Sequence, residues 1–221
     1  MNRCSRPDPR EMMRRSAATA LTLLALAGCG AAEAPVLGPG RPWQIAYDGY
    51  GHVLASTHHG AVLLALQPAR PTSPAKTHAA LVLSRSSWRG FTAEVRLRTN
   101  RQLRQPRPNA WEVGWLLWHY VSDERFYYIA LKPNGWELGK ADPNYPGQQR
   151  FLATGTHPAF PTARWYAVRV QQRGDVIQVS VDGRRLVRFV DTQDPILSGR
   201  VGLYVEDASA TYQPVAFDPA P

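Results

Sequence analysis

The sequence predicts an all-β fold, an antiparallel β-sandwich of the jelly-roll type, from three observations. Short stretches rich in β-branched, aliphatic and aromatic residues follow one another from Trp43 onward, and no long stretch has a helical period. Residues 90–100 alternate between apolar and polar side chains, as a strand with one buried face does. Asn134-Gly135 and Asp182-Gly183 are typical hairpin turns, because both central residues of such a turn favour positive φ. Hairpins with one apolar face must stack as two sheets to bury it.

The strands and loops follow from the same pattern. The expected strands cover, in chain order, residues 52–57, 61–66, 78–84, 90–100, 111–121, 126–131, 136–140, 165–171, 176–181, 185–190, 201–206 and 211–217. Residues 173–175 are expected to close a further hairpin, and residues 68–74 and 105–109 read as Pro-rich loops. Residues 142–150 and 155–162 form a long loop region, which is where binding sites are often placed.

The N-terminal residues predict export and a lipid anchor. Residues 1–15 are basic, residues 16–27 form an apolar stretch too short to span a membrane, and the segment ends Leu26-Ala27-Gly28-Cys29. This ending resembles a bacterial lipobox, which implies lipidation of Cys29. We therefore expect a lipoprotein signal peptide at 1–28, a tether at 29–42 and a single β-sandwich domain at 43–221. An ordinary secretory signal with a chance Cys is the alternative.

Cysteine content and charge exclude several classes of function. The two Cys residues are Cys4, inside the expected signal, and Cys29, so the domain has no disulfide, thiol nucleophile or Cys-based metal site. The formal net charge is +9, but five Arg lie before residue 29 and the remaining basic residues are spread along the chain. We expect no nucleic-acid partner. The predicted location is the outer side of the cytoplasmic membrane or the outer membrane, and a monomer is expected.

Four short motifs give the domain a family resemblance. They are GFTAEVRL at 90–97, WYAVRV at 165–170, IQVSVDG at 177–183 and GRVGLY at 199–204, in that order. The chain resembles the concanavalin A-like lectin/glucanase superfamily. That superfamily includes laminarin- and xyloglucan-cleaving enzymes, laminin-G-type binding modules and 3-keto-disaccharide hydrolase-like domains of bacterial secreted proteins. The resemblance covers roughly residues 43–218 and implies a concanavalin A-like jelly roll on a bacterial lipoprotein.

Two departures from the family limit what the resemblance implies about chemistry. Laminarinase-type members carry a Glu-x-Asp-x-(x)-Glu run on one strand, which sets nucleophile and acid at the spacing of a retaining mechanism, and this chain has none. Many relatives have an Asp, often a calcium ligand, where this chain reads Gln213 after Tyr212. A neutral amide weakens a hard-cation site. We therefore expect no cofactor, with calcium as a doubtful alternative.

The densest aromatic region, residues 111–136, is the expected carbohydrate site. Strand parity puts Glu112, Gly114, Leu116, Trp118 and Tyr120 on one face, with His119 on the opposite face beside Trp115. Aromatic planes pack against sugar rings while charged groups bond the hydroxyls. The predicted contacts are Trp118, Tyr120, Tyr128, Lys132, Trp136 and Lys140, joined by Glu94, Arg96 and Arg98 on a strand expected in the same sheet. The alternative is that these aromatic residues form the sandwich core.

Glu112 and Glu137 are the predicted catalytic pair if the protein is an enzyme. Both lie within the aromatic region, where apolar neighbours raise a carboxyl pKa. Ion pairs to a nearby Arg or to Lys140 are the alternative. His58 and His59 are expected on opposite faces of a strand and so unable to share a metal.

Three functions remain open at this point. The first is an exported, lipid-anchored protein whose jelly roll binds carbohydrate on an aromatic and polar sheet face. The second is a glycoside hydrolase or lyase-type enzyme that acts on a glycosidic bond. The third is a structural envelope protein that binds a protein partner, which burial of the aromatic residues would favour.

Overall fold

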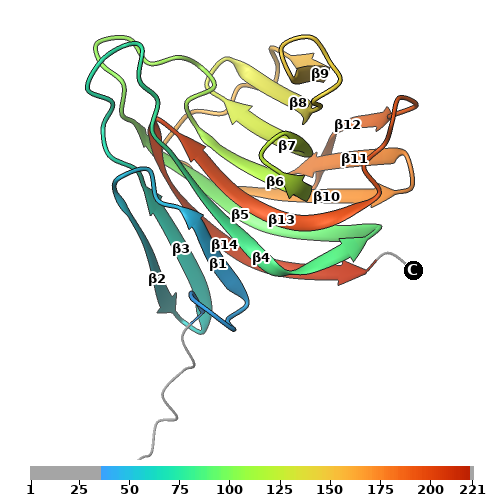
Figure 1. Cartoon of the computed structure of the whole chain (residues 1–221), viewed down its shortest axis with the longest axis horizontal. Helices are drawn as coiled ribbons and strands as arrows, with labels where there is room; N and C mark the ends of the chain where they lie inside the picture. The colour runs from blue at the N-terminus through green and yellow to red at the C-terminus, as the bar shows by residue number, and fades with distance from the viewer. Residues whose placement is uncertain (1–35, 220–221) are drawn as a thin grey trace, which may run out of the picture. The chain divides into compact units, whose positions relative to one another are not determined.

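The computed structural model describes residues 36–219, which contain fourteen strands in two antiparallel sheets (Figure 1). Sheet 1 has the order β1 (Trp43–Tyr47), β4 (Ala79–Arg89), β13 (Ser198–Glu206), β6 (Gly114–Ser122), β7 (Arg125–Lys132), β8 (Gly135–Ala141) and β9 (Gln149–Gly155). Sheet 2 has the order β12 (Arg184–Val190), β11 (Val176–Val181), β10 (Tyr166–Arg173), β5 (Phe91–Gln102), β14 (Ala208–Pro219), β3 (Ala61–Gln67) and β2 (His52–His58). The predicted all-β sandwich is confirmed.

The described residues contain no α-helix, and hence no apolar helix long enough to cross a membrane. The predicted signal peptide and Cys29 lie outside the described residues. Residues 36–42 were expected in the tether, but Val36 and Leu37 pack against the core and the Trp43 amide donates to the Val36 carbonyl at 3.2 Å. The packed part of the chain therefore includes residues before Trp43.

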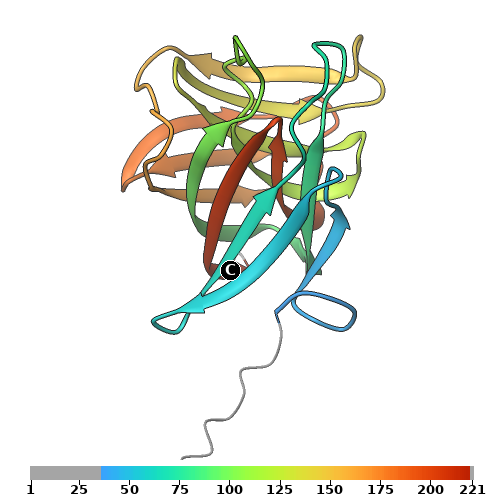
Figure 2. The same ribbon diagram turned by 90° about the vertical axis from the view of Figure 1, so that its left-hand side faces the viewer.

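The core lies between the two sheets because alternate residues of each strand point inward. Along β5, Phe91, Ala93, Val95 and Leu97 are buried, as the alternation predicted. Side chains from sheet 1, including Leu116, Ile129 and Leu203, belong to the same apolar cluster. Figure 2 shows the sandwich after a 90° turn, with the β2–β3 hairpin at one end of sheet 2.

Two strands of the structure, β1 and β9, were not predicted from the sequence. The strand β9 was missed because its two ends fall in the expected loop segments 142–150 and 155–162. Both are edge strands of sheet 1. An edge strand pairs on one side only, and β9 alternates poorly because most of its side chains are partly or fully exposed. The sequence signal for such strands is weak for that reason.

The hairpin turns were predicted with mixed accuracy. Asp182 and Gly183 have φ of 49° and 77° and join β11 to β12, as expected. The turn between β7 and β8 lies one residue earlier than predicted, because Lys132 pairs with Gly135 and leaves Pro133 and Asn134 as the central residues. Pro fixes φ near −65°, so this turn does not have positive φ at both positions.

A β-bulge in β6 reverses the predicted faces after Trp118. His119 has φ of 47°, and the pairing of β6 with β7 shifts register between Trp118 and Ser122. The neighbouring chain fits closely there, because a Cβ on Gly199 would come within 2.3 Å of the His119 backbone. His119 therefore lies in the core, and Tyr120 lies on the outer face.

The outer face of sheet 1 carries a second apolar cluster. Its buried members are Leu81, Leu83, Val113, Trp115, Leu117, Tyr128 and Ala130, and Tyr47, Tyr120, Phe126 and Tyr204 pack around them. A sheet face that points away from the sandwich is usually polar, since it meets water. This aromatic outer face is therefore the candidate location of the functional site.

Candidate functional site

A pocket of about 300 Å³ opens on the outer face of sheet 1, and we call it the sheet 1 pocket. It is lined by Trp111, Trp115, Glu137, Gln149, Phe151 and Glu206. These residues come from β6, β8, β9 and β13 and from the loop before β6. The pocket therefore combines three aromatic rings with two carboxyl groups and one amide.

The aromatic residues of the pocket differ in exposure. Trp115 is 7% exposed, its indole N–H donates to the Trp111 carbonyl at 2.9 Å, and its ring stacks on Tyr128 with centroids 4.5 Å apart. Trp111 and Phe151 are 46% and 59% exposed. Trp115 thus forms a fixed wall, while Trp111 and Phe151 offer aromatic surface to a ligand.

Glu137 is held by hydrogen bonds at the pocket wall. Its carboxylate accepts the Tyr128 hydroxyl at 2.7 Å and the Lys132 ammonium at 2.7 Å. Gln149 donates from Nε2 to the Tyr128 oxygen at 2.7 Å. Burial and the neighbouring Glu137 raise the pKa of Tyr128, so its hydroxyl stays protonated and donates. Tyr128 and Lys132, both predicted sugar contacts, therefore hold Glu137 in place and do not themselves line the pocket.

Glu206 is the second carboxyl group of the pocket. Burial raises the pKa of Glu206, and the negative charges of Asp207 and Glu112 raise it further. A hydrogen bond from the Tyr204 hydroxyl at 3.0 Å lowers the pKa but does not offset the increase. The pocket is thus lined by one carboxyl group with a raised pKa and one ion-paired carboxylate, a combination suited to proton transfer. It also supplies both a donor and an acceptor for hydroxyl groups.

Glu112 lies outside the pocket. Its side chain is fully buried, pairs with Arg104 at 2.5 Å and accepts the Asn109 amide at 2.7 Å. Arg104 also pairs with Asp207 and donates to the Pro74 carbonyl at 3.0 Å. The arrangement is the ion pair considered above as the alternative, and it joins three loops at one end of the sandwich.

Lys140 and Trp118, two predicted sugar contacts, are buried inside the sandwich. The Lys140 ammonium donates to Asp191 at 2.9 Å and to the carbonyls of Gln193 and Asp194 at 2.7 and 2.9 Å. The Trp118 indole donates to the Gln172 side chain at 2.7 Å. Neither residue presents a surface to solvent.

The other predicted contacts on sheet 1 also have structural partners. Trp136 points into the core and donates to the His157 carbonyl at 3.0 Å. Tyr120 lies on the outer face, where its hydroxyl donates to Asp123 at 2.8 Å. Trp118, Tyr128 and Trp136 are all buried, so they form no shared exposed patch.

The prediction that Glu94, Arg96 and Arg98 share a sheet with the aromatic region is wrong. They lie on β5, which pairs with β10 and β14 in sheet 2. The Pro-rich loop after β5 carries the chain to sheet 1 before β6 begins, so consecutive strands fall in different sheets. Sequence order gave no signal for this crossing.

Five pocket residues were not among the predicted site residues. They are Trp111, Trp115, Gln149, Phe151 and Glu206. Alternation along β13 puts Gly202, Tyr204 and Glu206 on one face, which is the signal that could have found Glu206. No comparable signal existed for Phe151, because residues 149–155 alternate poorly.

The sequence predicted that His58 and His59 do not share a metal ion. Among residues 36–219 no group of three or more His, Cys, Asp or Glu is placed to hold a metal. His58 ends β2, and His59 has φ of 50° in the following turn. The two rings are therefore in contact, with centroids 4.2 Å apart, rather than on opposite faces as expected.

Comparison with known proteins identifies the fold. No protein-family model and no curated protein match the sequence. The chain is similar to the carbohydrate-binding module CBM66 from Bacillus subtilis, with a TM-score of 0.58 and 17% identity over 80% of this chain and 95% of that chain. It is also similar to a Bacillus subtilis protein of unknown function with a galectin-like fold, with a TM-score of 0.52 and 11% identity over 80% and 88% of the two chains. A native glycosidic hydrolase gives a TM-score of 0.51 at 12% identity over 79% and 90%.

At these identities the similarity establishes the architecture, a β-sandwich of the jelly-roll type. The ligand has to be inferred from the pocket itself.

Proposed function

We propose that the sheet 1 pocket binds a carbohydrate. The observation that carries the proposal is that Trp111 and Phe151 are exposed on the same pocket as Glu137, Gln149 and Glu206. A sugar ring has an apolar C–H face and a rim of hydroxyl groups. Exposed aromatic planes bordered by carboxyl and amide groups complement both features. The jelly-roll similarity to a carbohydrate-binding module supports the same ligand class.

Two kinds of residue would bind the sugar, aromatic rings by stacking and polar groups by hydrogen bonding. Trp111 and Phe151 supply stacking surface, which costs little entropy because aromatic side chains have few rotatable bonds. Glu137 is already fixed by Tyr128 and Lys132, so it can accept ligand hydroxyl groups without further ordering.

A glycan-array screen of the purified protein tests the proposal, with Trp111→Ala and Phe151→Ala as pocket variants. We expect each to weaken binding of the best glycan by about 10-fold, which corresponds to about 1.4 kcal/mol. Tyr50→Ala removes an aromatic ring that is 86% exposed and does not line the pocket, so it is the matched control. Equal loss in the control would contradict the assignment.

An enzyme acting on a glycosidic bond is the second candidate, and the pair Glu137 and Glu206 favours it. Such enzymes use two carboxyl groups, one of them with a raised pKa. Glu206→Gln and Glu137→Gln should then abolish product release while leaving much of the binding. If the wild-type protein binds a glycan and never cleaves it, the enzyme hypothesis fails and carbohydrate binding is the function that remains.

The location proposed for this function is the cell envelope. The lipobox-like ending at Cys29 supports a lipid anchor, and the protein is expected to act there as a monomer. Labelled fatty acid should enter the wild-type protein and not Cys29→Ser. If no glycan is bound at all, a protein partner in the envelope becomes the better hypothesis, because Trp118, Tyr128 and Trp136 are buried.

A further inference from the structure

The outer face of sheet 2 has a chemistry unlike that of the sheet 1 pocket. The strands β5, β10, β11 and β12 contain eight Arg residues and a single acidic residue, Glu94. The residues between them in sequence, such as Val95, Val168 and Val179, are buried in the core. The polar side chains that alternate with these core residues, such as Glu94, Arg169 and Ser180, therefore point outward together.

Strand register orders these side chains into rows. Arg169 lies opposite Glu94 on one side and Ser180 on the other, and Ser180 lies opposite Arg185. The adjacent row contains Thr92, Gln171, Gln178 and Arg188. Neighbouring strands are about 4.8 Å apart, so each row presents a polar group at that interval.

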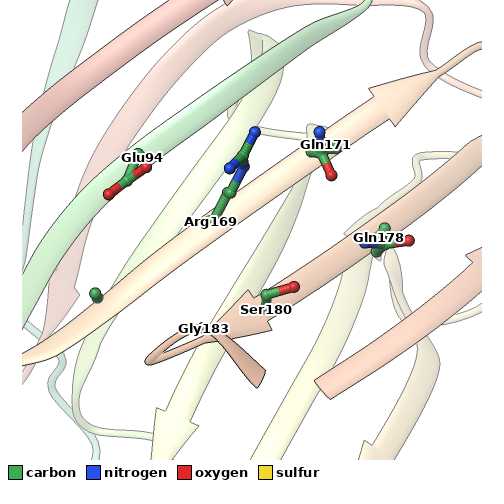
Figure 3. Close-up of a pocket in the computed structure, with 7 residues that line it drawn as sticks. Glu94, Arg169, Gln171, Gln178, Ser180 and Gly183 are labelled. Atoms are coloured by element: carbon green, nitrogen blue, oxygen red, sulfur yellow. The ribbon is translucent and has the colours of Figure 1, made fainter. Parts of the chain in front are cut away.

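The centre of this face is a pocket of about 390 Å³. Figure 3 shows Arg169 between Glu94 and Gln171, with Gln178 and Ser180 on the next strand. Its lining consists of one guanidinium group, one carboxylate, two amides and one hydroxyl, together with Ala167 and Gly183. Amide and hydroxyl groups suit sugar hydroxyls, and a guanidinium group suits a carboxylate.

The Arg side chains of this face form no direct ion pair with the described part of the protein. Among the ion pairs of residues 36–219, none involves Arg96, Arg98, Arg169, Arg185 or Arg188. Arg96 is held by a hydrogen bond to Gln213 at 3.2 Å and lies over the Trp165 ring at 5.5 Å. Arg98 has a buried Nε that donates to no acceptor in this part of the chain. The charges of Arg169, Arg185 and Arg188, which form no ion pair within residues 36–219, are those left for a ligand.

We propose that this face is a second binding site, for an anionic polysaccharide such as a polyuronate. Its carboxylates would pair with the Arg side chains, and its hydroxyl groups would bond Gln171, Gln178 and Ser180. A membrane surface fits less well, because Val190 is the one exposed large apolar side chain on these four strands and interfacial binding needs apolar anchors. The site lies on the opposite side of the sandwich from the sheet 1 pocket and is independent of it.

Polygalacturonate is the test ligand, with a neutral galactan as its uncharged counterpart. Binding of the full chain is measured at low and high salt. We expect the protein to bind polygalacturonate and not galactan through this face, with affinity that falls as salt rises. Arg169→Gln with Arg188→Gln should weaken binding by about 10-fold or more. Glu94→Gln should strengthen it, because it removes the negative charge from the site.

Two control variants test whether polygalacturonate binds at this face and not elsewhere on the protein. Arg107→Gln removes one exposed Arg from a loop outside this face, and it should leave binding unchanged. Trp111→Ala should also leave it unchanged, which separates this site from the sheet 1 pocket. No binding to polygalacturonate overturns the proposal, as does an equal loss in Arg107→Gln. Tighter binding to phosphatidylglycerol vesicles that depends on the same two Arg residues would assign the face to a membrane instead.

Discussion

Replacing Lys140 with Met should strongly destabilise the fold. The Lys140 ammonium is fully buried and donates to Asp191, whose carboxylate also accepts the Tyr127 hydroxyl at 2.5 Å. Burial alone would raise the pKa of Asp191, but hydrogen bonds from Tyr127 and Lys140 outweigh it and hold the pKa below its ordinary value. Met has a similar volume and no charge, so the variant leaves a buried carboxylate with one partner fewer.

The expected size follows from the burial of both charges. Removing one partner of a buried ion pair costs about 3–5 kcal/mol. The variant also frees two backbone carbonyls, those of Gln193 and Asp194, in the loop before β13. For a domain of this size each kcal/mol lowers Tm by about 2–4 °C, so the expected fall is about 6–20 °C.

Guanidinium unfolding followed by Trp fluorescence measures the effect directly. The control is Arg125→Met, because Arg125 pairs with Asp194 in the same loop at 2.8 Å but in an exposed position. An exposed pair contributes about 0–1 kcal/mol. Adding Asp191→Asn to Lys140→Met should cost less than the sum of the single changes, since the unpaired charge is removed.

A Lys140→Met protein whose free energy of unfolding lies within about 1 kcal/mol of the wild type, the value for an exposed pair, would contradict a stabilising role for the buried ion pair. Equal losses in Lys140→Met and Arg125→Met would refute it as well. Either result would mean that the buried network adds no more stability than an ordinary surface ion pair.

Two further changes test other parts of the structure. Burial lowers the pKa of His119 from 6.5 to about 4, so protonation favours the unfolded chain. The contribution of His119 to the free energy of unfolding should be fully present above pH 6.5 and should fall by about 3 kcal/mol as the pH drops to 4. His119→Asn should flatten this pH dependence in urea unfolding, whereas exposed His58→Asn should not, and an unchanged slope in His119→Asn would contradict the assignment. Gly139→Ala places a Cβ 2.2 Å from the Tyr128 ring, which should lower the free energy of unfolding by about 1–3 kcal/mol and displace the Tyr128 hydroxyl from Glu137. Wild-type glycan binding together with an unchanged Tm would contradict this expectation and show that the ring moves freely.

Much of the fold could be predicted from the sequence because strands leave local signals. The alternation at residues 90–100 identified β5 and its buried face, and Asp182-Gly183 located the β11–β12 hairpin. These features depend on neighbouring residues in the chain. Edge strand β9 left no such signal because most of its side chains are partly or fully exposed.

Less of the candidate site could be predicted. Glu137 was identified from its aromatic surroundings and does line the sheet 1 pocket. Glu112 came from the same argument and is instead paired with Arg104. Whether a carboxylate meets solvent or a buried guanidinium depends on loops distant in sequence, which composition and spacing do not reveal.

The sequence by itself determined the all-β class, most strand positions and the buried face of β5, because these follow from residue order along a pleated chain. The tertiary structure decided which strands share a sheet, where the β6 bulge turns Tyr120 outward, and which charges are buried. It alone separated Glu94, Arg96 and Arg98 from the aromatic region and brought Trp111, Phe151 and Glu206 together. Those outcomes depend on long-range strand pairing, which brings distant residues together in a way that local sequence does not encode.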